Sequence, residues 1–233
     1  MSLRVTARIL APVLILTLVS PVEAYSSKRT KQRRLRHPEA VFQLQSIPGI
    51  HVRNGIRAFG TEKAVCIFEK AVSAVRACHA GTHDIFVGDL SWRGGGKMRP
   101  HASHRDGRDI DVGYYFKEGG ARSIRHTAPA ALDATRTWAL LDAMISTGQV
   151  EYVFVWYSLQ KPLYQAALKS GRTPAELAPI FQYPRTAWNR RGIIRHLRGH
   201  NDHFHVRFTP GPHKSASEEK CESSSSSVAA PRD

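Results

Sequence analysis

The chain has 233 residues, 42% of them hydrophobic, and carries a formal net charge of +15. This length suffices for one domain with a substantial core and argues against a second domain once the two ends are set aside. The excess of Lys and Arg argues against an acidic protein that would repel polyanions. It favours anionic partners but does not specify a reaction.

The first 24 residues have the pattern of a secretory signal peptide. Arg4 and Arg8 precede an apolar run at residues 9–19, and Val22-Glu23-Ala24 forms a small-x-small cleavage site. The alternative is a membrane anchor, but the eleven apolar residues fall short of the ~20 that span a bilayer. We therefore expect an exported protein, in the periplasm or secreted. Such a protein meets cell-wall polymers and lipid headgroups, so nucleic acid is not an expected partner.

The segments next to both ends differ in composition from the rest. Residues 25–37 form a basic arm, either a flexible leader or a contact for an anionic surface. Residues 215–233, "SASEEKCESSSSSVAAPRD", have low complexity and are expected to be disordered. The folded domain is therefore predicted at residues 38–214.

In chain order, the first predicted element is a helix that Thr61 caps. Val65, Phe68 and Val72 recur at steps of three and four residues, and the helix is predicted to end near Gly81. The run "DIFVGDL" predicts a buried strand. The following "SWRGGGKMRP" lacks the residues of a phosphate-binding loop, and we interpret it as a flexible approach to a site.

The second half alternates irregularly between strands and helices. The segments "RDIDVGYYF", "QVEYVFVWY" and "HFHVRF" predict strands, and "ATRTWALLDAMISTG" predicts an amphipathic helix that Gly148 ends. A second helix is predicted at residues 159–169, and Thr173-Pro174 opens a short third one. This order predicts a single α+β domain with a central, mostly antiparallel sheet flanked by helices.

The three cysteines do not form a Cys-x-x-Cys site. Cys66 and Cys78 fall in one predicted helix, which would hold them ~18 Å apart, whereas a disulfide tolerates ~7 Å. They are therefore not expected to pair with each other. Cys221 lies in the predicted tail and could form a disulfide with either Cys66 or Cys78, and spacing alone does not choose between them.

Five of the twelve histidines lie in two clusters. His101 and His104 belong to "HASHRDGRDIDV", whereas His200, His203 and His205 belong to "GHNDHFHVRF". Side chains two positions apart share a face of a strand, so His203 and His205 should point the same way, as should Asp109 and Asp111.

A catalytic zinc site needs about three protein ligands and one open position. A histidine and an aspartate of the first cluster with a histidine of the second would supply them, and a free histidine nearby would exchange protons near neutral pH. The competing interpretation is a histidine-rich basic surface loop beside a strand with unrelated histidines.

The two motifs together resemble the penicillin-insensitive murein endopeptidases. These are zinc hydrolases of the wider group that contains lysostaphin-type peptidases, D-Ala-D-Ala carboxypeptidases and the hedgehog signalling domain. The shared pattern is His, six residues, Asp, and a late His-x-His. The sequences "VGDL", the Gly-rich loop, "EYVFV" and "HVRF" extend the resemblance over most of residues 85–208.

The resemblance implies a role for each motif residue. It makes His104, Asp111 and His205 the zinc ligands and His203 the catalytic histidine that handles the proton. His200 would orient His203 or stabilise the oxyanion. Two further residues, His101 and Asp109, would support the ligands or contact a second metal. Asp106 is expected to be solvated.

The reaction that the resemblance implies is hydrolysis of peptide cross-links in peptidoglycan, at a D-alanyl to meso-diaminopimelyl amide. Water activated by zinc would attack the carbonyl, and β-lactams, which acylate serines, would not inhibit the enzyme. Two alternatives remain. One is a D,D-carboxypeptidase or dipeptidase of the same group, and the other is a non-catalytic, zinc-containing protein that binds the wall or another polyanion.

Overall fold

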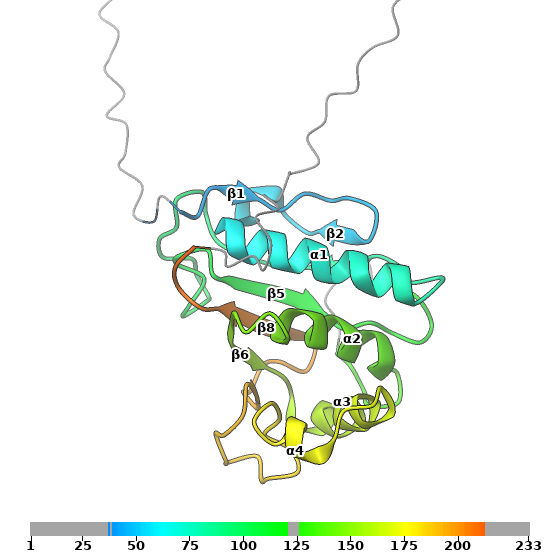
Figure 1. The fold of residues 1–233 in the computed structure, drawn as a ribbon. Helices are drawn as coiled ribbons and strands as arrows, with labels where there is room; N and C mark the ends of the chain where they lie inside the picture. Colours follow the sequence, from blue (N-terminus) through cyan, green and yellow to red (C-terminus); the bar gives the residue numbers. More distant parts are fainter. Residues whose placement is uncertain (1–36, 38, 121–125, 213–233) are drawn as a thin grey trace, which may run out of the picture. The chain divides into compact units, whose positions relative to one another are not determined.

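A computed structural model of the chain describes residue 37 and residues 39–120 and 126–212 (Figure 1). The predicted signal peptide, the predicted tail at residues 215–233 and all of the predicted basic arm except His37 lie outside the described residues. Among the helices in these described ranges, none has the length and apolarity needed to cross a bilayer.

A six-stranded sheet forms the centre of the described residues, in the order β2-β4-β5-β8-β6-β7. Its middle strands β5 (Asp109–Gly113), β8 (His203–Phe208) and β6 (Val150–Phe154) pair antiparallel, as do β4 (Ile85–Val87) and β5. The edge strands β2 (Ile50–Val52) and β7 (Ile194–Arg195) pair parallel to β4 and β6. The prediction of a mostly antiparallel sheet is confirmed.

A small second sheet and a short 3-10 helix precede the first long helix. Strands β1 (Phe42–Gln43) and β3 (Phe59–Gly60) pair antiparallel, and η1 (Gly55–Arg57) lies between them in the sequence. Strands of two or three residues carry no periodicity, so the sequence patterns predicted none of these elements.

Two of the helices, α1 and α4, begin at the capping residues that the sequence predicts. In α1 (Glu62–Cys78) the Thr61 side chain accepts a hydrogen bond from the Ala64 amide, which confirms Thr61 as the cap. The next helices are α2 (Ala134–Ile145) and α3 (Tyr157–Lys169). The short α4 (Pro174–Leu177) starts with a complete capping box made by Thr173 and Glu176.

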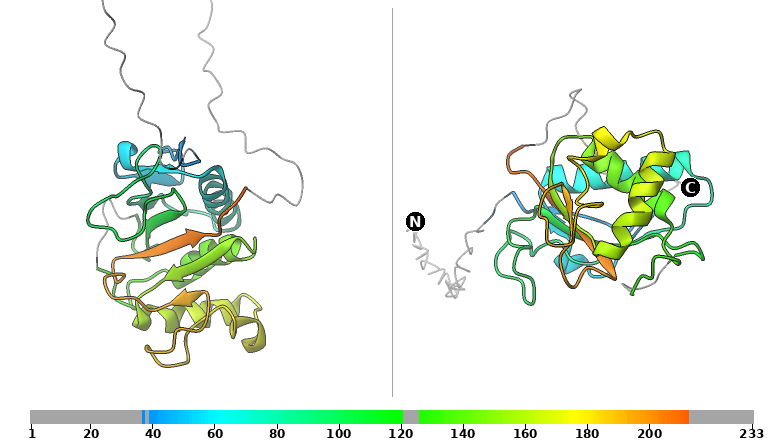
Figure 2. Two further views of the ribbon diagram at one scale, coloured as in Figure 1. Left: turned by 90° about the vertical axis from the view of Figure 1, so that its left-hand side faces the viewer. Right: turned by 90° about the horizontal axis from the view of Figure 1, so that it is seen from below.

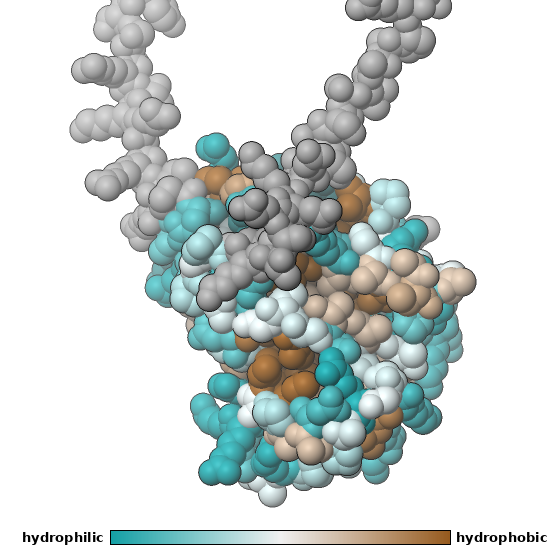
Figure 3. All heavy atoms as spheres, in the orientation of Figure 1, coloured by the Kyte–Doolittle hydropathy of each residue, from teal (hydrophilic) through white to brown (hydrophobic). Residues whose placement is uncertain are grey.

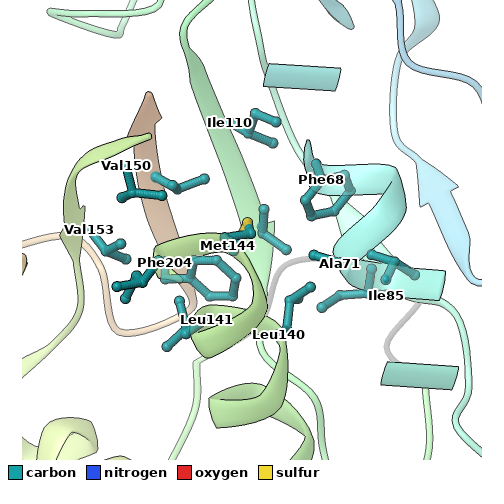
Figure 4. Packing of buried hydrophobic residues seen from close by; sticks show 14 of the residues in the cluster. Phe68, Ala71, Ile85, Ile110, Leu140, Leu141, Met144, Val150, Val153 and Phe204 are labelled. Atoms are coloured by element: carbon teal, nitrogen blue, oxygen red, sulfur yellow. The ribbon is translucent and has the colours of Figure 1, made fainter. Parts of the chain in front are cut away.

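The hydrophobic core lies between the helices and one face of the sheet (Figures 1 and 2). Figure 4 shows Phe68 of α1 and Leu140 and Met144 of α2 directed toward Ile110 of β5 and Phe204 of β8. Burying each such side chain contributes about 1.5–3 kcal/mol to folding. Because side chains alternate along a strand, this packing leaves the other face of β5 and β8 to polar residues.

The cysteines follow the prediction made from helix geometry. Cys66 and Cys78 both lie in α1; Cys66 is disulfide-bonded, and Cys78 is free and exposed. The two therefore do not pair with each other. Cys221 lies outside the described residues.

The Gly-rich loop after β4 is tied by a backbone hydrogen bond to the loop that carries His104. Gly94, Gly95 and Gly96 all have positive φ, and the Gly96 amide donates to the Arg105 carbonyl at 2.7 Å. A Cβ on Gly95 would lie 2.2 Å from that carbonyl oxygen. The glycines therefore allow two backbone segments to approach closely, which is a more specific role than flexibility.

Replacing Gly95 with alanine should destabilise the fold more than the same change at Gly81. Both residues have nearly equal φ, +68° and +69°, but a Cβ on Gly81 meets no atom within 4 Å. Gly81→Ala should cost about 1–2 kcal/mol for the left-handed conformation alone, and Gly95→Ala should cost more because the Arg105 backbone must move. Urea denaturation of both variants measures the difference, and equal losses would show that the close approach is unimportant.

Candidate active site

The candidate site is built on the face of β5 and β8 that points away from the helices. On β5, Asp109 and Asp111 alternate with Ile110 and Val112, which are in the core. The antiparallel register places Asp111 opposite His205 and Asp109 opposite Arg207. The predicted shared faces of Asp109 with Asp111 and of His203 with His205 therefore meet across one strand pair.

His104 reaches this face from the loop before β5. It has a φ of +48°, a left-handed conformation that is uncommon for residues other than glycine, and its side chain is buried. Its backbone amide donates to Asp109 Oδ2 at 2.9 Å, and its Nδ1 donates to the Leu90 carbonyl at 2.7 Å. These bonds hold the ring so that Nε2 points toward β5 and β8.

Three ligand-type atoms converge at the centre of the site. His104 Nε2 lies 3.2 Å from Asp111 Oδ1 and 3.1 Å from His205 Nδ1, and His205 Nδ1 lies 3.0 Å from Asp111 Oδ1. Ligands at tetrahedral zinc, with bonds of about 2.0–2.1 Å, are separated by about 3.4 Å. The triangle is therefore close to the size that one ion requires.

When both rings are neutral, the outer hydrogen bonds of the two histidines leave their inner nitrogens with lone pairs. His104 Nδ1 donates to Leu90, and His205 Nε2 donates to Asp109 Oδ1 at 2.9 Å. A neutral ring that donates from one nitrogen can only accept at the other. Two imidazole lone pairs and a carboxylate oxygen thus face one another, and a cation fits this donor set, with outer partners of the kind common at metal sites.

The buried charges support one another. Burial alone would raise the pKa of Asp109, but hydrogen bonds from His205 and Arg207 outweigh it and hold this pKa at about 2. Burial likewise opposes ionisation of Asp111, yet His104 and His205 keep its pKa well below the usual range. For His205, burial favours the neutral ring, but Asp109 and Asp111 raise the pKa to about 9. The two carboxylates thus favour a positive charge next to them, either the second proton of His205 or a bound cation in its place.

His203 lies beside the triangle and has its own carboxylate partner. Its Nε2 is 3.6 Å from Asp111 Oδ1, and its Nδ1 donates to Asp202 Oδ1 at 2.6 Å. The carboxylate of Asp202 fixes the tautomer and orientation of the ring. His203 is therefore held within reach of a group bound at the triangle.

His200 packs next to His203, with ring centroids 4.9 Å apart. Its Nδ1 donates to the Arg198 carbonyl at 3.1 Å. Burial, followed by the charges of His203 and His205, lowers the pKa of His200 to about 4. The ring is therefore neutral at pH 7, and its Nε2 accepts hydrogen bonds.

His101 contacts the other oxygen of Asp111. Its Nδ1 is 3.6 Å from Asp111 Oδ2, and its Nε2 donates to Asp89 Oδ2 at 2.8 Å. His101, His104 and Asp111 form an alternative ligand set, with atoms within 4.8 Å of one another. The triangle with His205 is tighter, so it fits a single ion better.

Asp106 differs from its sequence interpretation. It is not a solvated residue, because its carboxylate pairs with Arg108 at 2.8 Å and with Arg207 at 2.9 Å. Arg207 also pairs with Asp109, which in turn holds His205. The expectation for Asp106 was wrong because its partner Arg207 is distant in the sequence, and no local pattern indicates that pairing. Asp106 thereby holds Arg207, which also pairs with Asp109.

Two acidic residues of the site were not singled out in the sequence. Asp89 is buried, pairs with Arg53 and Arg57, and holds His101. Asp202 precedes His203 and orients it. Asp89 stands in "VGDL" and Asp202 in "GHNDHFH", two of the motifs that carry the family resemblance. Their place in these motifs was the sequence signal that could have identified them.

Comparisons with known proteins agree with the motifs. The family model described as penicillin-insensitive murein endopeptidase matches residues 50–230. A curated protein of Haemophilus influenzae with the name penicillin-insensitive murein endopeptidase is 31% identical over 145 residues, which are 58% of this chain and 46% of the relative. The matched region thus spans about half the length of that relative.

Proposed function

Because the chain belongs to the penicillin-insensitive murein endopeptidase family, we propose that it hydrolyses an amide in the peptide cross-links of peptidoglycan. The proposed bond is the one between D-alanine and meso-diaminopimelate. The observation that carries this proposal is the convergence of His104 Nε2, Asp111 Oδ1 and His205 Nδ1 beside His203. Three ligands and a proton-exchanging group are what metal-assisted amide hydrolysis requires.

The metal proposed for this site is zinc, with His104, Asp111 and His205 as its ligands. Two imidazoles and one carboxylate are a ligand set that catalytic zinc sites use. When bound, zinc supplies Lewis-acid chemistry, polarising a carbonyl and lowering the pKa of water toward neutrality. Asp109 and Leu90 orient the two histidines, and His101 and Asp89 support Asp111 from its other side.

The proton is handled by His203. Its Nδ1 stays bonded to Asp202, so Nε2 is the nitrogen that accepts a proton from the attacking water and passes it to the leaving amine. His200 is neutral and accepts at Nε2, which favours a role in holding a substrate N–H over stabilising an oxyanion. The second role would need a donor.

A serine nucleophile is not part of this proposal. The sequence contains no Gly-x-Ser-x-Gly motif, and insensitivity to β-lactams would follow from hydrolysis without an acyl-enzyme. The proposed location is outside the cytoplasm, in the periplasm or beyond, where the cross-links are.

Purified, zinc-loaded protein should convert cross-linked muropeptide dimers into monomers. Mass spectrometry of the products gives the bond that is cleaved, and uncross-linked pentapeptide monomers in a parallel incubation should be left intact. Loss of the terminal D-alanine from those monomers would identify a D,D-carboxypeptidase instead. Binding of dimers without any cleavage would identify a non-catalytic wall-binding protein.

A further inference from the structure

A hollow of about 370 Å³ lies beside the candidate site and is lined by aromatic and basic side chains. Its walls include Trp156, Trp188, Leu197, Arg190 and Arg198. We call it the Trp188 pocket. None of the groups assigned to the reaction lines it, so the proposed chemistry leaves its purpose unexplained.

The Trp188 pocket and the site share the backbone that holds His200. The Trp156 amide donates to the His200 carbonyl at 3.1 Å, and His200 Nδ1 donates to the Arg198 carbonyl at 3.1 Å. Trp156 and Arg198 therefore each line the pocket and make a backbone contact to His200. The pocket thus adjoins the segment that holds His200.

The pocket presents unusually exposed apolar side chains. Trp188 is 85% exposed and Leu197 is 42% exposed, whereas the buried Trp138 is 2% exposed. A large aromatic side chain that stays in water contributes little to folding, and such residues concentrate where partners bind. The exposed indole therefore fits the flat, apolar face of a ring in a ligand.

The charge around the pocket has one sign. Residues 177–201 contain five arginines and no aspartate or glutamate. Arg190 and Arg198 are exposed and, over the described residues, neither guanidinium has a hydrogen bond or an ion pair. By contrast, Arg185 is occupied by the Phe181 and Ala178 carbonyls. The two unengaged guanidinium groups thus fit carboxylates, which they bind with paired hydrogen bonds. The lower left of Figure 3, over the loops between α4 and β8, is correspondingly hydrophilic.

We propose that the Trp188 pocket binds the glycan-bearing part of a muropeptide, with a sugar ring on the Trp188 indole and stem-peptide carboxylates on Arg190 and Arg198. This inference rests on the proposed function. A pyranose ring has an apolar C–H face that matches the indole, and the stem peptide joins that ring to the amide being cleaved. The pocket therefore selects cross-links that are still attached to glycan.

Steady-state kinetics with two substrates test the role of Trp188. One substrate is a disaccharide-bearing peptide dimer, and the other is the same dimer freed of sugar. Trp188→Ala should raise KM for the first about tenfold, leave its kcat unchanged, and leave KM for the sugar-free dimer unchanged. The matched control is Ile56→Ala, because Ile56 is 66% exposed and does not line the pocket. Equal KM values for wild type and Trp188→Ala with the glycan substrate would overturn the proposal.

Direct binding separates this proposal from the proposed function. Titration calorimetry with a disaccharide tetrapeptide, on His203→Ala protein, should show tight binding that Trp188→Ala and Arg190→Gln each weaken about tenfold. Lys161→Gln removes one exposed positive charge from α3 and should change nothing. If wild type cleaves no dimer but these binding differences persist, the proposed function fails and the pocket stands. If the wild type cleaves dimers but the pocket variants bind as tightly as the parent protein, the proposed function stands and the pocket proposal fails.

Discussion

Replacing His203 with alanine should abolish hydrolysis of muropeptide dimers and leave one zinc ion bound. His203 Nε2 lies 3.6 Å from Asp111 Oδ1, beside the triangle of candidate ligand atoms but not part of it. Removing a general acid–base group lowers kcat about 10²–10⁴-fold. Product analysis by mass spectrometry, together with zinc content from atomic absorption, measures both effects.

His51→Ala is a suitable control for this variant. His51 is an exposed residue of β2 whose ring stacks on Phe86, so removing it tests the loss of a histidine remote from the motifs. It should keep normal turnover and normal zinc content. Loss of zinc from His203→Ala would contradict the assignment, because His203 would then be a ligand.

Replacing His104 with alanine should remove both the metal and the activity. The His104 ring contributes one of three converging donors, and no other described side chain offers its nitrogen to both Asp111 and His205. Asp109→Asn provides a graded comparison, because loss of an outer partner costs about 10–100-fold in metal affinity. His104→Ala should cost more than that, as measured by zinc titration against a chelating dye.

Chelation of the wild-type protein should mimic His104→Ala and be reversed by added zinc. Penicillin should leave turnover unchanged, since the proposed reaction has no serine to acylate. Inhibition by penicillin without inhibition by a chelator would contradict the metal assignment and favour an acyl-enzyme.

The sequence predicted those parts of the fold that have strong local periodicity. The cap at Thr61 and the alternation in "RDIDV" and "HFHVRF" identified α1, β5 and β8, because each pattern depends on neighbours within one element. Strands β1, β2, β3 and β7 have only two or three residues, and their pairing depends on distant segments. No local pattern distinguishes them from loops.

The sequence points to the candidate ligands because the histidines are clustered and Asp111 stands at a regular spacing from them. Asp89 and Asp202 were missed because aspartates are common and their importance depends on the histidines that they contact. The same holds for Asp106, whose partner Arg207 is about a hundred positions away. Ion pairs between distant segments require the fold, and a sequence pattern does not contain them.

The pairing of β5 with β8 also determines when the site is complete during synthesis. Asp111 and His205 are opposed in the register but 94 positions apart in the chain, with α2, β6 and α3 between them. Chains emerge from the ribosome N-terminus first, so the candidate ligand triangle lacks His205 until nearly all of the described domain has been made. On the proposed function, a nascent or truncated chain that ends before β8 would therefore be inert toward peptidoglycan, however well its first half had folded.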